Sequence, residues 1–396
     1  MVKIMLKNRK ILIGVTGSIA IYKTLEIIRL FIKAEASVKI IMSEEAKRFI
    51  SPLTFEAISQ NRVLHVGTES WADELNHIHV GKWADIFVIA PMSANSINKI
   101  ANGIADNLLM QTILAFNKQI IIAPSANTNM LLNPATIKSL QKLKKLGFIT
   151  CKPQNKLLAC NDRGAGALAK PKYIFDVTTR ELLKDIFWKN KKVIITGGGS
   201  IEKIDDTRCL TNFSSGKQAN ALAYAYYVAG ANVTLITSKQ KKYPLIKTLH
   251  VKSSKEYKKA IQNSISKDSY LIMCAAISDF IPKETQSGKL KKNELGHEWN
   301  LKLIQNEDIL LEIDKKNIKT IGFKAEMNEN TALHNARNML NKKSLNAVCL
   351  NILGDKNGFG SLENEITFIT KQSEKKIKLA SKQIVANHIV KLSKEL

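Results

Sequence analysis

Two glycine-rich turns in this chain carry the residue types that bind a phosphate group. One reads Thr196-Gly-Gly-Gly-Ser200 and is followed closely by Thr211-Asn-Phe-Ser-Ser-Gly-Lys217. A similar turn, Gly14-Val-Thr-Gly-Ser-Ile-Ala20, lies near the N-terminus. Glycines let the backbone close around an anion, and the free N–H groups at a helix start point toward it. Because each turn opens a region of alternating strands and helices, the sequence predicts two nucleotide-type sites.

The turn near the N-terminus favours a mononucleotide. It has Gly14 and Gly17 followed by Ser18, but it lacks the GxGxxG pattern of dinucleotide-binding proteins. The second predicted strand ends at Ser43, where an acidic residue that binds a ribose is often found. These hydroxyl groups favour a mononucleotide phosphate, such as that of FMN.

Polar side chains also follow two later strands of the first half. His77 and His79 precede an apolar strand that continues into Ala90-Pro-Met-Ser-Ala-Asn95, and ligands bind at such strand ends. A lone histidine is more often structural than catalytic. The loop 123–130 is a second polar segment after a strand, and its alternative explanation is a set of Asx turns before a helix that starts at Pro134.

Cys160 stands in a polar and glycine-rich segment, Ala159-Cys-Asn-Asp-Arg-Gly-Ala-Gly166. A buried structural cysteine would normally have apolar neighbours. This setting therefore favours a mobile flap that delivers a thiol.

A lysine cluster in the second half, Lys289-Leu-Lys-Lys292, follows the segment Ala275-Ala-Ile-Ser-Asp279. Asp279 comes just after an apolar strand, where a carboxylate that binds Mg²⁺ would serve a nucleotide triphosphate. Lysines supply suitable point charges for the β- and γ-phosphates. The alternative is a solvated lysine face, which is the commoner explanation of such a cluster on its own.

The composition is that of a soluble protein with about two domains. The chain has 396 residues, of which 45% are hydrophobic and 24% charged. The apolar run 11–15 is too short for a signal peptide and no stretch is long enough to span a bilayer, so we expect no membrane association and a cytoplasmic protein. The five cysteines are scattered and lack CxxC spacing, which argues against a disulfide framework or a zinc site.

The net charge of +26 raises the alternative of a nucleic-acid-binding protein. The basic residues are spread along the whole chain, however, and no zinc-finger, bZIP or RRM signature is present. We therefore expect no nucleic-acid partner, and a lysine-rich surface with some lysines acting on phosphorylated substrates.

Short apolar strands alternate with amphipathic helices in both halves. The expected strands of the first half are 11–15, 38–42, 86–90 and 120–123. The pattern restarts with expected strands at 193–196, 233–237, 271–274, 319–323 and 347–350. This alternation predicts an α/β protein of two doubly wound domains, each with a parallel sheet covered on both faces. We place the boundary after a closing helix and a charged linker, giving domains at 1–189 and 190–396.

The first half resembles the flavin-dependent cysteine decarboxylase family, which has a flavodoxin-like fold. The motifs that carry the resemblance are Gly14-Val-Thr-Gly-Ser-Ile-Ala-Ile-Tyr-Lys23, His77-Ile-His-Val-Gly-Lys-Trp-Ala-Asp85, Pro91-Met-Ser-Ala-Asn-Ser96 and Ala101-Asn-Gly-Ile-Ala-Asp-Asn-Leu108. Asn127 matches the asparagine of the family's substrate loop, and Cys160 matches its flap cysteine. The chain departs from these two motifs at Ser125, Ala126, Asn161, Ala167 and Leu168.

The second half resembles phosphopantothenate–cysteine ligases, with a Rossmann-like fold. The matching motifs are Ile204-Asp-Asp-Thr-Arg208, Asn212-Phe-Ser-Ser-Gly-Lys217, Ala275-Ala-Ile-Ser-Asp279, Lys289-Leu-Lys-Lys292, Asn306-Glu-Asp-Ile309 and Gly322-Phe-Lys-Ala-Glu326. Departures occur at Gly199, Gln218 and Ala219, and at Met339, where the family has a lysine. Arg337 lies close enough in the sequence to substitute for that lysine.

The resemblance of the first half implies FMN as cofactor and decarboxylation of 4'-phosphopantothenoylcysteine. His77 would be the acid/base, Asn127 would hold the substrate's carboxylate and amide, and Cys160 would protonate the ene-thiolate. The residues implied to bind FMN are Gly17, Ser18, Ser43, Met92, Ser93 and Asn95. In this family the flavin site lies between subunits, which implies trimers.

The resemblance of the second half implies CTP-dependent ligation of cysteine to 4'-phosphopantothenate through an acyl-cytidylate. Asn212 would position the acyl-cytidylate, Lys289 would act on the triphosphate, and Asp279 would bind Mg²⁺. The residues implied to bind CTP are Gly198, Ser214, Ser215, Gly216, Ala275, Ala276, Asp279, Lys289, Lys292, Asn306, Asp308, Ile309, Phe323 and Lys343. Together the two resemblances imply a bifunctional enzyme of coenzyme A biosynthesis. They also imply a homo-oligomer in which the ligase domain forms dimers.

Two other functions remain open at this point. The first is a flavoprotein of single activity whose second half has become a binding module, indicated by flavin without CTP-dependent ligation. The second is the basic nucleic-acid-binding protein, indicated by a strongly salt-dependent affinity for DNA without flavin.

Overall fold

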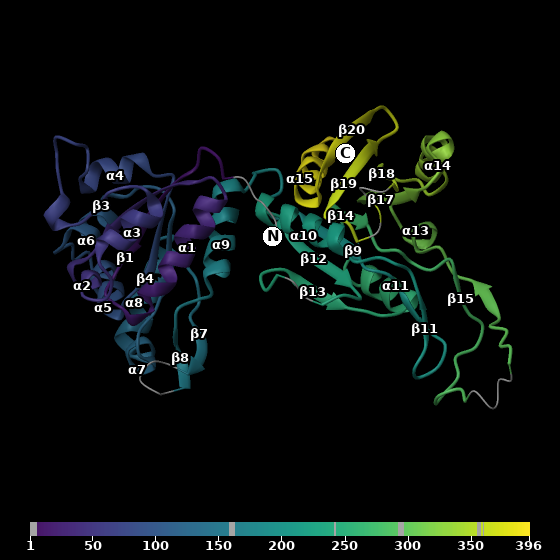
Figure 1. Ribbon diagram of the computed structural model, residues 1–396, viewed down its shortest axis with the longest axis horizontal. Helices are drawn as coiled ribbons and strands as arrows, with labels where there is room; N and C mark the ends of the chain where they lie inside the picture. The colour runs from purple at the N-terminus through teal and green to yellow at the C-terminus, as the bar shows by residue number, and fades with distance from the viewer. Residues whose placement is uncertain (1–5, 158–162, 241–242, 292–296, 355–357, 359) are drawn as a thin grey trace. The chain divides into compact units, whose positions relative to one another are not determined.

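The computed structural model describes residues 6–396, apart from 158–162, 241–242, 292–296, 355–357 and 359. Its chain forms two compact units, one that ends at Leu183 and one that runs from Lys184 to Leu396 (Figure 1). Each unit has its own sheet and its own core. Within the described residues, no helix is both long and apolar enough to cross a membrane.

The first unit alternates strands and helices along its whole length. Its strands are β1 (Lys10–Val15), β2 (Ser37–Met42), β3 (Val63–Leu64), β4 (Ile86–Met92), β5 (Ile120–Pro124), β6 (Ile149–Thr150), β7 (Gln154–Leu157) and β8 (Arg163–Ala167). Its helices are α1 (Tyr22–Lys33), α2 (Glu44–Lys47), α3 (Pro52–Ser59), α4 (His77–Trp83), α5 (Ala94–Ala101), α6 (Leu108–Ala115), α7 (Thr128–Leu132), α8 (Pro134–Lys145) and α9 (Pro171–Leu183), with short 3₁₀ turns η1 (Ile19–Ile21) and η2 (Val66–Thr68).

The main sheet of the first unit is parallel throughout and has the strand order β3-β2-β1-β4-β5-β6. Helices α4, α5, α6 and α8 share one core with the sheet, while α1 packs against α3 and α9 (Figure 1). Every residue of β4 and β5 is buried, as expected for strands covered on both faces. The doubly wound prediction is confirmed, and the strand order reverses between β1 and β4.

The second unit continues the same alternation and adds antiparallel elements at its end. Its strands are β9 (Lys192–Gly197), β10 (Ile201–Lys203), β11 (Cys209–Thr211), β12 (Asn232–Thr237), β13 (Lys247–His250), β14 (Ser269–Met273), β15 (Phe280–Pro282), β16 (Leu303–Gln305), β17 (Ile318–Glu326), β18 (Ala347–Ile352), β19 (Glu363–Ile369) and β20 (Glu374–Ser381). Its helices are α10 (Lys217–Ala229), α11 (Ser254–Gln262), α13 (Ile309–Glu312), α14 (Glu329–Lys342) and α15 (Lys382–Leu392), followed by η3 (Ser393–Glu395).

The sheet of the second unit has the order β13-β12-β9-β14-β17-β18-β19-β20. The strands from β13 to β18 are parallel, which confirms the second doubly wound domain, while β19 and β20 pair antiparallel at one edge. Two small antiparallel ribbons, β10–β11 and β15–β16, stand outside this sheet (Figure 1). Sequence patterning missed the edge pair and both ribbons; β20 and the ribbon strands carry too few buried residues to show a clear period.

Helix α10 is buried on nearly all sides, between β9 and β12 of the sheet and α15. Its alternation of alanine with tyrosine explains how it fits, because small side chains allow a close approach to the sheet. A Cβ atom on Gly197 would lie 2.3 Å from the Cβ of Ala219 in α10. Glycine at the end of β9 is therefore required by packing.

This contact makes a prediction about stability. Gly197→Ala should destabilise the unit 184–396 by about 1–3 kcal/mol, because two rigid backbones would have to move apart. Ala219→Gly should cost about 1 kcal/mol through helix propensity alone. Thermal and urea unfolding of the parent chain and of each variant would measure both losses of stability.

The double variant, Gly197→Ala with Ala219→Gly, should recover part of the stability lost in Gly197→Ala, since the second change removes the clashing methyl group. Strictly additive losses in the double variant would show that the two residues do not limit the approach of α10.

Candidate active sites

The first cleft lies at the edge where the parallel strands of the first unit end. Ser18, Ser43 and Ser93 follow β1, β2 and β4, and Asn127 follows β5. Each of these side chains caps the next helical segment, accepting hydrogen bonds from the N–H groups of Ala20, Ala46, Ser96 and Asn129. The strand ends therefore bring four residues, predicted separately from sequence, to one edge of the sheet.

These residues line a cavity of about 1160 Å³, together with Gly17 and Asn95. This volume exceeds the roughly 300–1,000 Å³ of an ordinary small-molecule site, so it has room for a cofactor and a substrate side by side. A Cβ on Gly17 would lie 2.7 Å from the Cβ of Glu45, so the β1 turn needs glycine to approach the start of α2. Met92 is fully buried in the core and does not line the cavity.

Four basic side chains line the same cavity, and sequence reasoning missed all of them: Lys23, Arg48, Lys99 and Lys156. Burial lowers the pKa of Lys23, and the adjacent Lys156 ammonium lowers it further. Lys23 stands in the quoted motif 14–23, but nothing in the sequence shows that Lys156 from the β7 strand faces it. Arg48 pairs with Glu45 and Lys99 pairs with Asp106, so Lys23 and Lys156 are the cations that best suit a phosphorylated ligand.

His77 is the first residue of α4, and it lies outside the lining of this cavity in the described chain. Its Nδ1 atom is 3.0 Å from Oε1 of Glu69, and the ring of Trp71 meets it edge-on with 5.7 Å between ring centroids. The Oδ1 atom of Asn76 caps the helix by accepting from the N–H groups of Ile78 and His79. The carboxylate and the indole thus fix the orientation of the imidazole.

Cys160 falls within 158–162, outside the described residues. The strands on either side of this segment, β7 and β8, form an antiparallel pair. The carbonyl of Gly166 in β8 accepts hydrogen bonds from the Ser125 hydroxyl at 3.3 Å and the Ala126 N–H at 3.2 Å. The base of the predicted flap is therefore tied to the loop that carries Asn127.

The second cleft encloses about 800 Å³ and gathers most of the residues expected to bind a nucleotide. Those that line it are Asn212, Ser214, Ser215, Gly216, Ala275, Ala276, Asp279, Asn306, Asp308, Ile309, Phe323 and Lys343. Met339, at the expected lysine position, lines it too, whereas Arg337 pairs with Glu374. Lys289 lies outside the lining in the described chain, and Lys292 lies outside the described residues.

Backbone and side-chain hydrogen bonds shape this second cleft. The Asn212 amide donates to the carbonyl of Ala276 at 3.2 Å, and the N–H of Ala276 donates to the carbonyl of Gly198 at 2.9 Å. Gly198 has φ +84°, a left-handed conformation that favours glycine, so it shapes the turn from behind the lining. Lys343 pairs with Asp308 at 2.7 Å.

Lys217, Lys324 and Lys382 also line the second cleft and were not predicted. Burial lowers the pKa of Lys382, and the nearby charge of Lys217 lowers it further. Within the described ranges, no cluster of three or more His, Cys, Asp or Glu residues is arranged to hold a metal ion. A single carboxylate such as Asp279 suits a Mg²⁺ ion that arrives with nucleotide phosphates rather than one held by protein ligands alone.

The fold and the clefts define an α/β protein of two compact units with a large cleft at the carboxyl edge of each sheet. The flavoprotein family matches residues 2–183, and the family of the DNA/pantothenate metabolism flavoprotein C-terminal domain matches residues 188–396. The chain is 34% identical over 394 residues to the coenzyme A biosynthesis bifunctional protein CoaBC of Borreliella burgdorferi, covering 98% of this chain and 99% of that protein. With the CoaBC of Haemophilus influenzae it shares 35% identity, over 97% of each chain.

Two solved structures resemble one unit each. A mutant PPC decarboxylase complexed with pantothenoylaminoethenethiol is 32% identical, with a TM-score of 0.39, and covers 43% of this chain and 97% of its own. The C-terminal domain of a CoaBC protein is 29% identical, with a TM-score of 0.44, and covers 53% of this chain and 97% of its own.

The near-complete coverage by relatives decides the family. This chain belongs to the coenzyme A biosynthesis bifunctional proteins, CoaBC. It is therefore a bifunctional enzyme of coenzyme A biosynthesis, with a phosphopantothenate–cysteine ligase activity and a phosphopantothenoylcysteine decarboxylase activity.

The described cysteines should differ sharply in reactivity. Burial raises the pKa of Cys151 to about 12, and it raises the pKa of Cys349 as well, whereas Cys209 is exposed on β11. At neutral pH, iodoacetamide should alkylate Cys209 in the native protein and leave the two buried thiols unmodified.

Peptide mass spectrometry would measure this labelling, and the same reaction in urea provides the control in which every thiol reacts. Alkylation of Cys151 at the rate of Cys209 in the folded chain would contradict its burial. Cys151→Ser should keep parent decarboxylase kinetics but lower stability, since it buries a hydroxyl in place of a thiol.

Proposed function

We propose that the first cleft binds FMN and decarboxylates 4'-phosphopantothenoylcysteine. The observation that carries this proposal is the row of capping side chains at the ends of β1, β2, β4 and β5. Backbone N–H groups of the Gly17–Ser18 turn, with the hydroxyls of Ser43 and Ser93, would hold the FMN phosphate. Asn95 would contact the flavin, and Met92 could do so through its backbone only. When bound, FMN would supply a reversible two-electron sink: it would take two electrons from the CH–SH unit of the substrate, so that the resulting C=S group can accept the electron pair released with CO₂, and it would return two electrons to the product.

The protein's own residues would handle the substrate. The Asn127 amide, held at the start of α7, would bind the substrate's carboxylate and amide. His77 would move the proton of the substrate, with its Nδ1 held by Glu69 and its Nε2 atom left to face the ligand. Cys160 would protonate the ene-thiolate from the β7–β8 hairpin.

We further infer that the decarboxylase site needs more than one copy of the chain. His77 does not line the cavity that contains Asn127, although both are expected to act on one substrate. A second copy that supplies His77 would complete the site, as expected for a trimer. Dimers of the ligase domain would then build a larger homo-oligomer.

Subunit mixing tests this arrangement. His77→Gln and Asn127→Asp should each abolish decarboxylation as pure proteins. Co-expressed in equal amounts, they should recover about a quarter of the parent sites, because each site takes one residue from each of two copies. CO₂ release from the purified mixed oligomers would measure the recovery. Mixed oligomers that stay inactive would contradict a shared site, and the visible flavin spectrum would confirm that both variants load FMN.

We propose that the second cleft activates 4'-phosphopantothenate with CTP and then ligates cysteine. The main support for this proposal is that twelve of the residues expected to bind CTP or the acyl-cytidylate line one cavity. Ser214, Ser215 and Gly216 would cradle phosphate at the start of α10, and Asp279 would hold Mg²⁺ on the triphosphate. Gly198 would support the cradle from behind, and the cytidine would lie between Phe323 and Lys343.

Substitutions of Asn212 and of Lys289 should impair different steps of the ligation. Lys289→Gln should impair formation of the acyl-cytidylate, because it removes a charge that aids departure of pyrophosphate; one such contact is typically worth about 2–4 kcal/mol. Asn212→Asp should still activate the carboxylate but transfer it poorly to cysteine, so the acyl-cytidylate should accumulate. Radiolabelled CTP with phosphopantothenate, with and without cysteine, separates the two outcomes. Parent rates for both variants at both steps would overturn this placement of the ligase site.

A further inference from the structure

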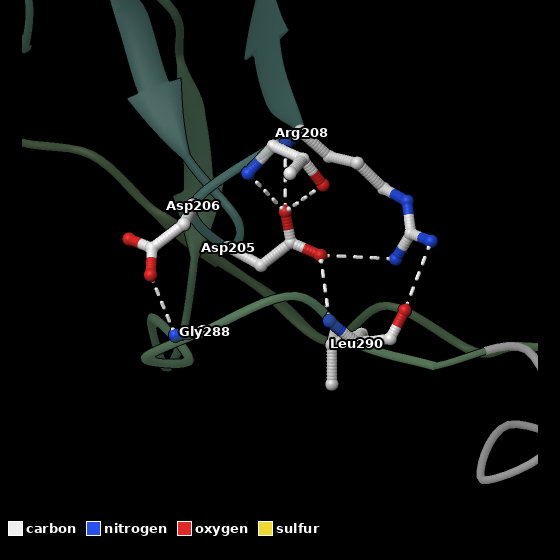
Figure 2. A network of polar contacts seen from close by, with 6 residues as sticks. Asp205, Asp206, Arg208, Gly288 and Leu290 are labelled. Atoms are coloured by element: carbon white, nitrogen blue, oxygen red, sulfur yellow. Dashed lines mark hydrogen bonds and ion pairs between the residues drawn. The ribbon is translucent and has the colours of Figure 1, made fainter.

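A buried carboxylate ties the segment that carries Lys289 to the ribbon that leads into Asn212. Asp205 lies in the turn between β10 and β11 and its side chain is fully buried. Its Oδ1 atom accepts three hydrogen bonds: from the N–H and the hydroxyl of Thr207, at 2.7 and 2.9 Å, and from the N–H of Arg208, at 2.6 Å. Its Oδ2 atom accepts from Nη1 of Arg208 at 3.0 Å and from the N–H of Leu290 at 3.2 Å (Figure 2).

The residues on both sides of Lys289 are held through their backbones. On one side, the N–H of Gly288 donates to the Asp206 carboxylate at 2.6 Å, and its carbonyl accepts from the Asp206 N–H at 3.1 Å. On the other side, Leu290 donates to Asp205 and its carbonyl accepts from Nη2 of Arg208 at 3.1 Å (Figure 2). The backbone of Lys289 is thus fixed at two points, while its side chain takes no part in the network drawn in Figure 2.

The charge of Asp205 makes this attachment strong. Burial alone would raise the pKa of the Asp205 carboxyl, but the hydrogen bonds from Thr207, Arg208 and Leu290 outweigh it and lower the pKa to about 2. Hydrogen bonds to an ionised acceptor are shorter and stronger than neutral ones. Because the pKa in the folded state lies below the ordinary 3.8, this stabilisation is present above about pH 4 and is lost only as the pH falls toward 2. The carboxylate is therefore charged at neutral pH.

We propose that Asp205 is a positioning residue of the ligase, holding Lys289 in a fixed relation to Asn212 through the β10–β11 turn. The route is short: β11 runs directly into Asn212, and the same turn binds both neighbours of Lys289. This inference rests on the proposed ligase role of Lys289. Asp206 and Arg208 complete the attachment, and Asp205 is its centre because it alone accepts from both segments and from the guanidinium.

Asp205→Asn tests the proposal. An amide keeps the size of the carboxylate but removes its charge, and its NH₂ group would face donors instead of accepting from them. The first half-reaction, formation of acyl-cytidylate from CTP, should slow by about 10²-fold through misplacement of Lys289. The KM for CTP should change much less, because the residues that line the cleft are untouched.

A double-variant cycle separates positioning from a general loss of fold. If Asp205 acts through Lys289, Asp205→Asn should slow the half-reaction by about 10²-fold in the parent chain but leave a Lys289→Gln chain unchanged. Asp206→Asn is the milder second variant, because that carboxylate is half-exposed, pairs with Lys203, and accepts from Gly288 on one side of Lys289 only. Its smaller loss should also vanish in the Lys289→Gln chain. Glu284→Gln, which removes a carboxylate from the same segment, is the matched control and should keep the parent rate.

The outcomes are distinct. Two outcomes would overturn the positioning role while leaving the ligase assignment intact. In one, Asp205→Asn slows the half-reaction by the same factor in the parent chain and in the Lys289→Gln chain. In the other, Asp205→Asn alone keeps the parent rate. A parent rate for Lys289→Gln by itself would instead overturn the proposed function of that lysine and this inference with it. Unchanged flavin absorbance and decarboxylation in each variant would show that the rest of the enzyme is folded.

Discussion

The first cleft depends on one constraint, which is the need to satisfy the polar backbone where buried parallel strands end. Each strand leaves the core and turns into a helix whose first N–H groups have no partner within the helix. Ser43, Ser93 and Asn127 accept hydrogen bonds from those N–H groups. The ends of parallel strands lie at one edge of a sheet, so the groups that stabilise the helix starts are also the groups that line the cavity. Stability and binding therefore impose the same residue types at these positions.

The same constraint explains which parts of the molecule could be predicted from its sequence. Buried strands such as β4 and β5 are unbroken apolar runs followed by polar caps. This pattern predicts both doubly wound sheets and most of the residues that line the clefts. The pair β19–β20 could not be predicted in this way, because β20 is largely exposed and charged and has no clear hydrophobic period. Its position is set by antiparallel pairing with β19, which is a tertiary contact.

Single residues show the limits of motif matching. The motif that contains Ser93 also includes Met92, yet Ser93 lines the cavity and Met92 is buried in the core, because Met92 is the last residue of the buried strand β4 and Ser93 is the N-cap of α5. Lys156 and Lys382 lie outside the quoted motifs but line the clefts, because folding brings distant segments to the same edge. These lysines also show that part of the high positive net charge lies in the two clefts. Positive side chains in both clefts favour phosphorylated ligands, whereas the nucleic-acid alternative needs a continuous basic surface.

Two of the groups proposed to react, one for each activity, belong in sequence to the connections between ribbon strands rather than to the strand ends of the main sheets. Cys160 belongs to the segment between β7 and β8, and Lys289 belongs to the segment between β15 and β16. A ribbon can move a thiol or an ammonium group relative to a bound substrate, but a free ribbon would place it poorly. Each connection is flanked by hydrogen bonds to another part of its unit. The Gly166 carbonyl accepts from Ser125 and Ala126 near Asn127, and the Asp205 carboxylate, in the β10–β11 turn, accepts from Leu290. Under the functions proposed above, the carboxyl edge of each sheet would bind the ligand, and a segment tied to the same unit by hydrogen bonds would carry one of the reactive groups.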